Sequence, residues 1–131
     1  MKSLLLLSML FCHIIDDYYL QGLLASLKQK KWWDEHAQQE LYKKDYLMAL
    51  FEHAFSWSFM IHIPIIAVMV LNDNIDSISL LLTVIINTIA HAVIDDMKAN
   101  KLKINLIQDQ LLHFGQILAT MLIYAYIINI L

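Results

Sequence analysis

Four apolar stretches divide the chain, and short polar connections separate them. A membrane core about 30 Å thick is crossed by roughly 20 apolar residues in a helix. The stretches lie at residues 4–27, 46–71, 78–97 and 106–131. The pattern predicts an all-α fold in one transmembrane domain, residues 1–131, in which four helices form an integral membrane bundle.

Each apolar stretch is interrupted by histidine or carboxylate. Charged groups inside a bilayer are costly, so residues of this kind are candidates for function. Three of the interruptions pair a histidine with an aspartate four residues apart, which places both side chains on one helix face. The interruptions are His13-x3-Asp17, Glu52-His53, His91-x3-Asp95 and Asp109-x3-His113.

Most of these side chains are predicted to share one depth. At about 1.5 Å per residue, they fall roughly 5–15 Å from one end of their helices, although His13 is deeper, at about 20 Å. At about 100° per residue, each helix carries its polar residues in one stripe. We therefore predict one buried polar site, which excludes Asp16, Asp96 and His62 by their direction and His36 by its position in a connection.

The lysines indicate how the bundle is oriented. The first and third connections carry most of them, and the second carries two aspartates and no lysine. The positive-inside rule makes the lysine-bearing side cytoplasmic, with both termini outside. Residues 28–44 combine charges of both signs with two tryptophans. This segment is either a short amphipathic helix on the cytoplasmic surface or a charged loop. The net charge of −3 argues against nucleic acid as a partner.

The residue types in the predicted site suit a divalent metal. Mixed imidazole and carboxylate donors favour zinc, with manganese and iron as the other candidates. The candidate ligands outnumber the four that one tetrahedral zinc takes. They therefore fit either one metal with further residues that orient its ligands, or two metals. The candidate ligands are His13, Asp17, His53, His91, Asp95, Asp109 and His113.

A metal with an open coordination position would activate water for hydrolysis. Asp17 or Glu52 is then the candidate general base. A site in the cytoplasmic leaflet would meet a membrane lipid or a lipid-linked substrate. Lys28 and Lys98, close to the cytoplasmic mouth, would attract an anionic head group.

Several elements of the chain resemble, in order, the small bacterial and phage integral membrane proteins of the domain of unknown function 3307 family. The elements are HIIDDYYLQ, LASLKQKKWW, LFEHAF, HAVIDDMKA and DQLLHFGQ. The resemblance implies a bacterial inner (cytoplasmic) membrane protein, and its motif positions add Gln21 and Gln110 to Lys28 and Lys98 as substrate-binding candidates. More distantly, the chain resembles inner-membrane metal-dependent hydrolases, which implies hydrolysis only.

Other interpretations of the same residues remain open. A proton- or metal-ion-conducting transporter would also place aspartate and histidine inside the bundle, although the outer halves of the helices are nearly all apolar. The His–Asp pairs could hold the helices together, or His53 and His113 could ligate haem. A non-catalytic protein could modulate a partner through residues 28–44. Helices rich in Ile and Leu could also bury a homo-oligomer interface.

Overall fold

The computed structural model describes residues 2–127, and every regular element in that range is helical. Four segments are long and apolar enough to cross a membrane: Lys2–Leu20, Glu40–Leu71, Ser77–Ala99 and Leu106–Ile127. The predicted number of membrane-length helices is therefore confirmed. The elements are α1 (Lys2–Ile15), the π-helix η1 (Asp16–Leu20), α2 (Leu24–Leu27), α3 (Lys30–His36), the 3-10 helix η2 (Glu40–Tyr42), α4 (Asp45–Leu71), α5 (Ser77–Ala99) and α6 (Leu106–Ile127).

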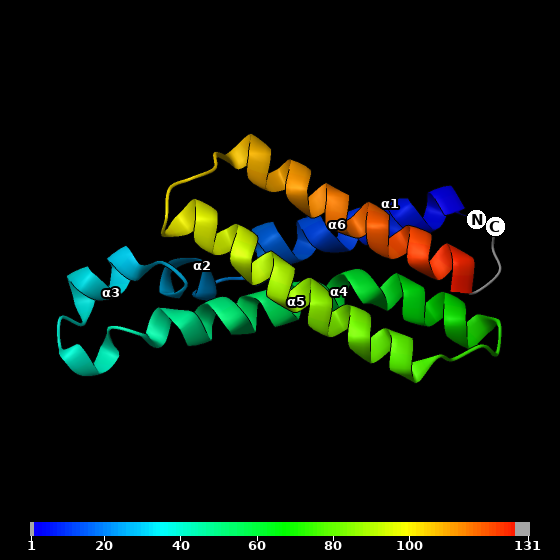
Figure 1. Cartoon of the computed structure of the whole chain (residues 1–131), viewed down its shortest axis with the longest axis horizontal. Coiled ribbons are helices and arrows are strands. Elements are labelled where there is room, and N and C mark those ends of the chain that lie inside the picture. The colour runs from blue at the N-terminus through cyan, green and yellow to red at the C-terminus, as the bar shows by residue number, and fades with distance from the viewer. Residues whose placement is uncertain (1, 128–131) are drawn as a thin grey trace.

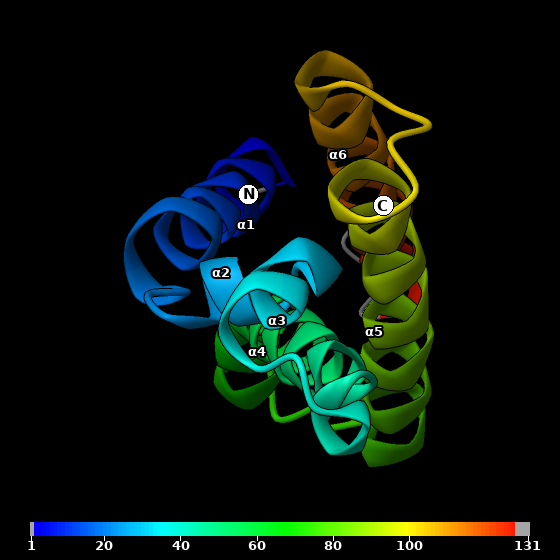
Figure 2. The same cartoon turned by 90° about the vertical axis from the view of Figure 1, so that its left-hand side faces the viewer.

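The long helices run alternately up and down (Figure 1). The start of α1, the end of α6 and the turn between α4 and α5 lie at one end of the bundle. The short helices α2 and α3 and the connection between α5 and α6 lie at the other, which we call the lysine-rich end. The view onto that end shows the four long helices around a common centre (Figure 2). α4 packs against α1 and α5, and α6 closes the ring against the same two helices.

The first membrane-length helix is shorter than predicted. It ends at Leu20 rather than at residue 27, because the chain turns at Gly22, whose φ of +48° lies in the left-handed region. Glycine adopts that conformation without steric cost, whereas other residues rarely do. Residues 23–27 are apolar but belong to a separate short helix. The other three spans agree with the helices to within a few residues, except that residues 128–131 lie outside the described range.

The segment between the first two long helices is partly helical and closes the lysine-rich end. α2 and α3 pack against α4, and Asn100 ties them to the end of α5. The Asn100 side chain accepts from the Lys30 backbone N–H (2.7 Å) and donates to the Lys28 carbonyl (3.2 Å). Within residues 28–44, the helix interpretation holds for Lys30–His36, where Trp32 and Trp33 are half-buried.

At the other end of the bundle, α5 begins with a capping aspartate. Ser79 donates to the Asp76 carboxylate from its backbone N–H (3.1 Å) and from its hydroxyl (2.6 Å). These hydrogen bonds lower the pKa of Asp76. The cap satisfies a donor in the first turn of α5, so this helix has a defined start.

Polar contacts join α5 to α6 in the middle of the bundle. Thr83 Oγ1 lies 2.6 Å from the Tyr124 hydroxyl, and Asn87 donates to Thr120 Oγ1 over 2.9 Å. Lipid solvates apolar helix faces as well as another helix does, so packing and polar contacts hold membrane helices together. These hydrogen bonds are therefore expected to position α6 relative to α5.

We predict that Thr83→Val destabilises the bundle by about 0.6 kcal/mol, and by at most about 1.7 kcal/mol, because it removes a hydroxyl that contacts Tyr124 and His62. Thr88→Val is the matched control on the same helix, since the Thr88 hydroxyl donates to the Val84 carbonyl of its own helix. Reversible unfolding in mixed micelles measures both. Equal effects of the two substitutions would contradict the prediction.

Candidate metal centre

A π-helical turn places two consecutive aspartates in the bundle. The Gln21 N–H bonds to the carbonyl of Asp16, five residues earlier, over 3.0 Å. The wider turn lets Asp16 and Asp17 both face inward, with exposures of 1% and 8%. The prediction that Asp16 points away from the site is wrong, because it assumed the 100° spacing of a regular α-helix. π-turns occur frequently at functional sites.

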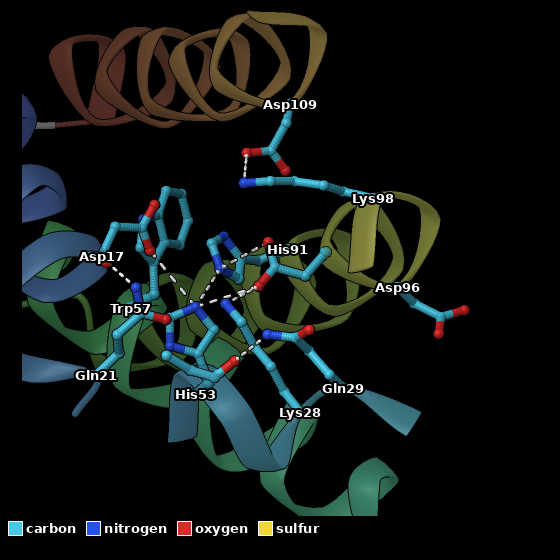
Figure 3. A network of polar contacts seen from close by, with 12 residues as sticks. Asp17, Gln21, Lys28, Gln29, His53, Trp57, His91, Asp96, Lys98 and Asp109 are labelled. Carbon is cyan, nitrogen blue, oxygen red and sulfur yellow. Dashed lines mark hydrogen bonds and ion pairs between the residues drawn. The ribbon is translucent and has the colours of Figure 1, made fainter. Parts of the chain in front are cut away.

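The first group of candidate ligands joins three long helices. His53 Nε2 lies 3.4 Å from Asp17 Oδ1 and 3.2 Å from His91 Nε2. The donor atoms that these three residues offer lie within 4.8 Å of one another. Figure 3 shows the three side chains pointing toward one another between their helices.

The second group adds the fourth long helix. His113 Nε2 lies 3.4 Å from Asp95 Oδ1 and 3.4 Å from Asp109 Oδ1. His91, Asp95 and His113 also offer donor atoms within 4.8 Å of one another. Asp95 connects the groups, because its other oxygen, Oδ2, lies 3.3 Å from His53 Nε2. The predicted convergence of these side chains from four helices is confirmed.

The hydrogen-bond network assigns the proton positions on His113. The Gln116 amide nitrogen donates to Asn87 Oδ1 (3.3 Å), which leaves the Gln116 oxygen to accept from His113 Nδ1 (3.1 Å). In the neutral ring, Nε2 then carries a lone pair. That lone pair faces carboxylate oxygens of Asp95 and Asp109, so the arrangement is repulsive unless a cation or a proton lies between them.

Carboxylates outnumber lysines in the site. Lys28 Nζ lies 2.5 Å from Asp95 Oδ2, and Lys98 Nζ lies 2.7 Å from Asp109 Oδ2. Asp16 and Asp17 are buried as well, so four carboxylates face two ammonium groups. With all four carboxylates ionised and the histidines neutral, two negative charges remain, and buried uncompensated charge is strongly unfavourable. One divalent cation, or two protonated histidines, would restore neutrality.

Buried polar atoms without hydrogen-bond partners cluster at this site. In native proteins such atoms are few, and a cluster of them indicates a bound ion or water. Within residues 2–127 they are Asp16 Oδ2, Asp17 Oδ1, Gln21 Oε1, His53 Nδ1, His91 Nδ1, Asp109 Oδ1 and His113 Nε2. Nitrogen and oxygen donors of these types fit zinc, manganese or iron. The residues therefore fit a divalent metal, and the two groups of candidate donors have His91 in common.

His13 is not placed as a metal ligand, which corrects its predicted role. Trp57 Nε1 donates to His13 Nδ1 over 2.7 Å, and His13 Nε2 lies 3.1 Å from Gln110 Oε1. Both ring nitrogens are therefore engaged by the protein. Gln110 in turn donates to Asp109 Oδ2 (3.1 Å), and Trp57 stacks on His91 at 4.2 Å between ring centroids. His13 thus positions groups around the centre.

Glu52 does not reach the site, which corrects its candidacy as general base. It is exposed on α4, because it lies one residue, or about 100°, away from the buried His53. The same angular rule, applied to the sequence alone, excludes Glu52 from the site. Asp17, with its Oδ1 facing the histidines, is the base candidate that the geometry retains.

The other exclusions are confirmed. Asp96 points away from the centre and pairs with Lys101 at 2.6 Å, a hydrogen bond that raises the pKa of Lys101 (Figure 3). His36 is exposed and stacks on Trp32. His62 lies farther along the bundle, where it contacts the Ser58 carbonyl at 2.7 Å.

A pocket of about 410 Å³ opens at the lysine-rich end and leads to the centre. Gln21, Lys28 and Lys98 line it together with Asp95. A smaller hollow of about 100 Å³ continues from it to Asp17, Asp109 and Gln110. All four residues predicted to bind substrate therefore line these two spaces, although both lysines are also paired with carboxylates of the centre.

No protein-family model, no curated protein and no solved structure matches the chain. The resemblance to the domain of unknown function 3307 family stays a prediction.

We predict that the purified protein binds zinc stoichiometrically. His91→Ala and His113→Ala should abolish binding, since each removes a nitrogen from a buried group of donors. His36→Ala is the control, because it removes an exposed histidine outside the centre. Elemental analysis and competition with a chelating dye measure the content and the affinity. Wild-type protein without metal, or unchanged binding in both alanine variants, would rule out the centre.

We also predict a positioning role for Asp16. Its Oδ2 lies 4.0 Å from His53 Nδ1, and its Oδ1 accepts from Ser56 over 2.7 Å. At 4.0 Å the two atoms are not hydrogen-bonded, so Asp16 would act through its negative charge, which raises the basicity of a ligand histidine. Asp16→Asn should lower metal affinity about 10- to 100-fold. Asp96→Asn, the same substitution at a surface ion pair, should leave it unchanged, and equal effects of the two would refute the role.

Proposed function

We propose that the protein is a membrane-embedded metal-dependent hydrolase that acts on a lipid or a lipid-linked substrate. One observation carries the proposal. Two overlapping groups of histidine and aspartate, drawn from all four long helices, lie at the inner end of a pocket lined by Lys28 and Lys98. Metal donors, a candidate base and a route for substrate therefore occur together.

The residues divide by role. His53, His91, His113 and Asp95 would hold the metal, which when bound lowers the pKa of a coordinated water toward neutrality. Asp17 Oδ1 would accept the proton of the attacking water, because no residue among 2–127 donates a hydrogen bond to this buried oxygen. Hydrolysis adds the hydroxyl of water to the acyl or phosphoryl centre, and the leaving alcohol takes a proton.

The depth of the centre supports a substrate at the head-group level. The candidate ligands lie within about two turns of the lysine-rich ends of their helices, roughly 5–15 Å along the axis. We place that end in the cytoplasm of a bacterium by the positive-inside rule, with both termini outside the inner membrane. The scissile bond of a lipid in that leaflet would lie near this depth.

A second candidate function is ion or proton transport. The outer half of the bundle is less apolar than the sequence pattern indicated. Polar side chains, all buried except the half-buried Gln116, continue from His113 toward the opposite end: Gln116, Asn87, Thr120, Thr83, Tyr124 and His62. The link through Gln116 and Asn87 consists of amides, which keep their protons, so this chain is a weaker relay than one of histidines and carboxylates. We therefore place hydrolysis first.

We predict that zinc-loaded protein in lipid nanodiscs releases a hydrolysis product from a total bacterial lipid extract, measured by mass spectrometry. Asp17→Asn should slow release by about 100-fold or more, because it removes the base, whereas Asp96→Asn should not. An inactive wild type, together with proton flux into liposomes that Asn87→Leu abolishes, would replace hydrolysis by transport.

A further inference from the structure

The pocket at the lysine-rich end is one part of a longer path. It shares Gln21, Lys28, Asp95 and Lys98 with the small hollow beside the centre. That hollow shares Tyr18 and Gln110 with a third space of about 410 Å³. The three spaces are therefore neighbours that share walls, and together they trace a path from the lysines, past the carboxylates of the centre, to the side of the bundle.

The third space is a groove on the side of the bundle between α1–η1 and α6. Its walls are Ile14, Tyr18, Tyr19 and Phe114, and its polar residues are His13 and Gln110. The four wall residues are between 43% and 77% exposed. Both flanking segments are of membrane length, so this opening would face the hydrocarbon of the bilayer. The path thus begins at cationic groups and ends at an apolar surface.

The local fold explains why this side is open. After Leu20 the chain reverses at Gly22, and α2 and α3 pack against α4. The end-on view shows them across the α4 side of the ring, away from α6 (Figure 2). The connection therefore covers the end of the bundle and leaves the gap between η1 and α6 uncovered.

We propose that the substrate is an anionic lipid with a phosphate-bearing head group, which binds with the phosphate between Lys28 and Lys98 and one hydrocarbon chain in the groove between α1–η1 and α6. A metal held by Asp95 would compensate that carboxylate and leave the charge of Lys28 for an anion, and the Lys98 side chain, although paired with Asp109, is 38% exposed. A hydrocarbon chain fits the groove because its walls are apolar and it opens at membrane depth. Hydrolysis of this lipid rests on the hydrolase proposal, whereas binding of the lipid between the lysines and the groove does not.

Photo-capture of a lipid tests the path directly. The probe is a dialkyl ether phosphonate analogue of phosphatidic acid, which cannot be hydrolysed, with a diazirine in one chain. The full-length metal-loaded protein is irradiated with it in phosphatidylcholine nanodiscs, and adducts are mapped by mass spectrometry. We expect adducts at the groove, on Ile14, Tyr18, Tyr19 and Phe114. A dialkylglycerol probe of the same chain length, which lacks the phosphonate, should be captured there less.

Matched variants separate the two halves of the path. Lys28→Gln and Lys98→Gln should each weaken capture of the phosphonate about fivefold and leave the neutral probe unchanged. Ile14→Trp fills the groove and should abolish groove adducts of both probes. Ile89→Trp is its control on an exposed face of α5 away from the groove. Circular dichroism verifies that each variant is folded.

Three results would overturn the proposal: adducts spread evenly over all exposed helix faces, equal capture of both probes, or unchanged capture in Ile14→Trp. Failure of the hydrolase proposal gives a different result. Groove capture without turnover of any lipid would keep the binding path and remove the enzyme. Turnover without groove adducts would keep the enzyme and remove this path.

Discussion

The rest of the structure depends on the burial of four carboxylates in an apolar bundle. Asp16, Asp17, Asp95 and Asp109 are each less than 9% exposed, and two of them, Asp95 and Asp109, pair with lysines. Removing ions from water costs several kcal/mol each unless opposite charge compensates them. Lys28 and Lys98 compensate two of the carboxylates. The histidines add ring nitrogens beside the carboxylates, so that a divalent cation can bind there.

That constraint explains the irregular start of the fold. Lys28 reaches Asp95 only because the first long helix ends at Leu20 and the chain turns back over the end of the bundle. A helix that continued to residue 27 would move Lys28 farther along its axis, at about 1.5 Å for each residue. Asn100 then holds the returning segment against α5. The π-turn and the left-handed Gly22 are thus the local features that bring a second aspartate and a compensating lysine to one centre.

Most residues of the centre could be predicted from the sequence because they recur with the period of an α-helix. Pairs spaced at i and i+4 predicted that His91, Asp95 and His113 share one site, and a common depth added His53. Asp16 was missed because a π-turn changes the angle per residue, and no apolar pattern records that change. The role of His13 depends on Trp57 and Gln110, which come from two other helices, so no local rule could fix it. Glu52 differs, since careful angular counting would have excluded it.

Two polar clusters in one bundle allow a direct comparison between structural contacts and a binding centre. Between α5 and α6, the side chains of Thr83, Asn87 and Tyr124 all find hydrogen-bond partners, as expected of contacts that hold membrane helices together. At the centre, the same depth of burial leaves carboxylate oxygens and imidazole nitrogens of the described residues unpaired, with lone pairs directed at one another. Either protonation of the histidines, which pairs them with the carboxylates, or a cation between the donor atoms removes this repulsion, and each polar atom left unpaired costs about 1–3 kcal/mol. Coordination of a cation turns the same repulsive contacts into bonds, so the contrast within this one chain favours a binding role for the centre.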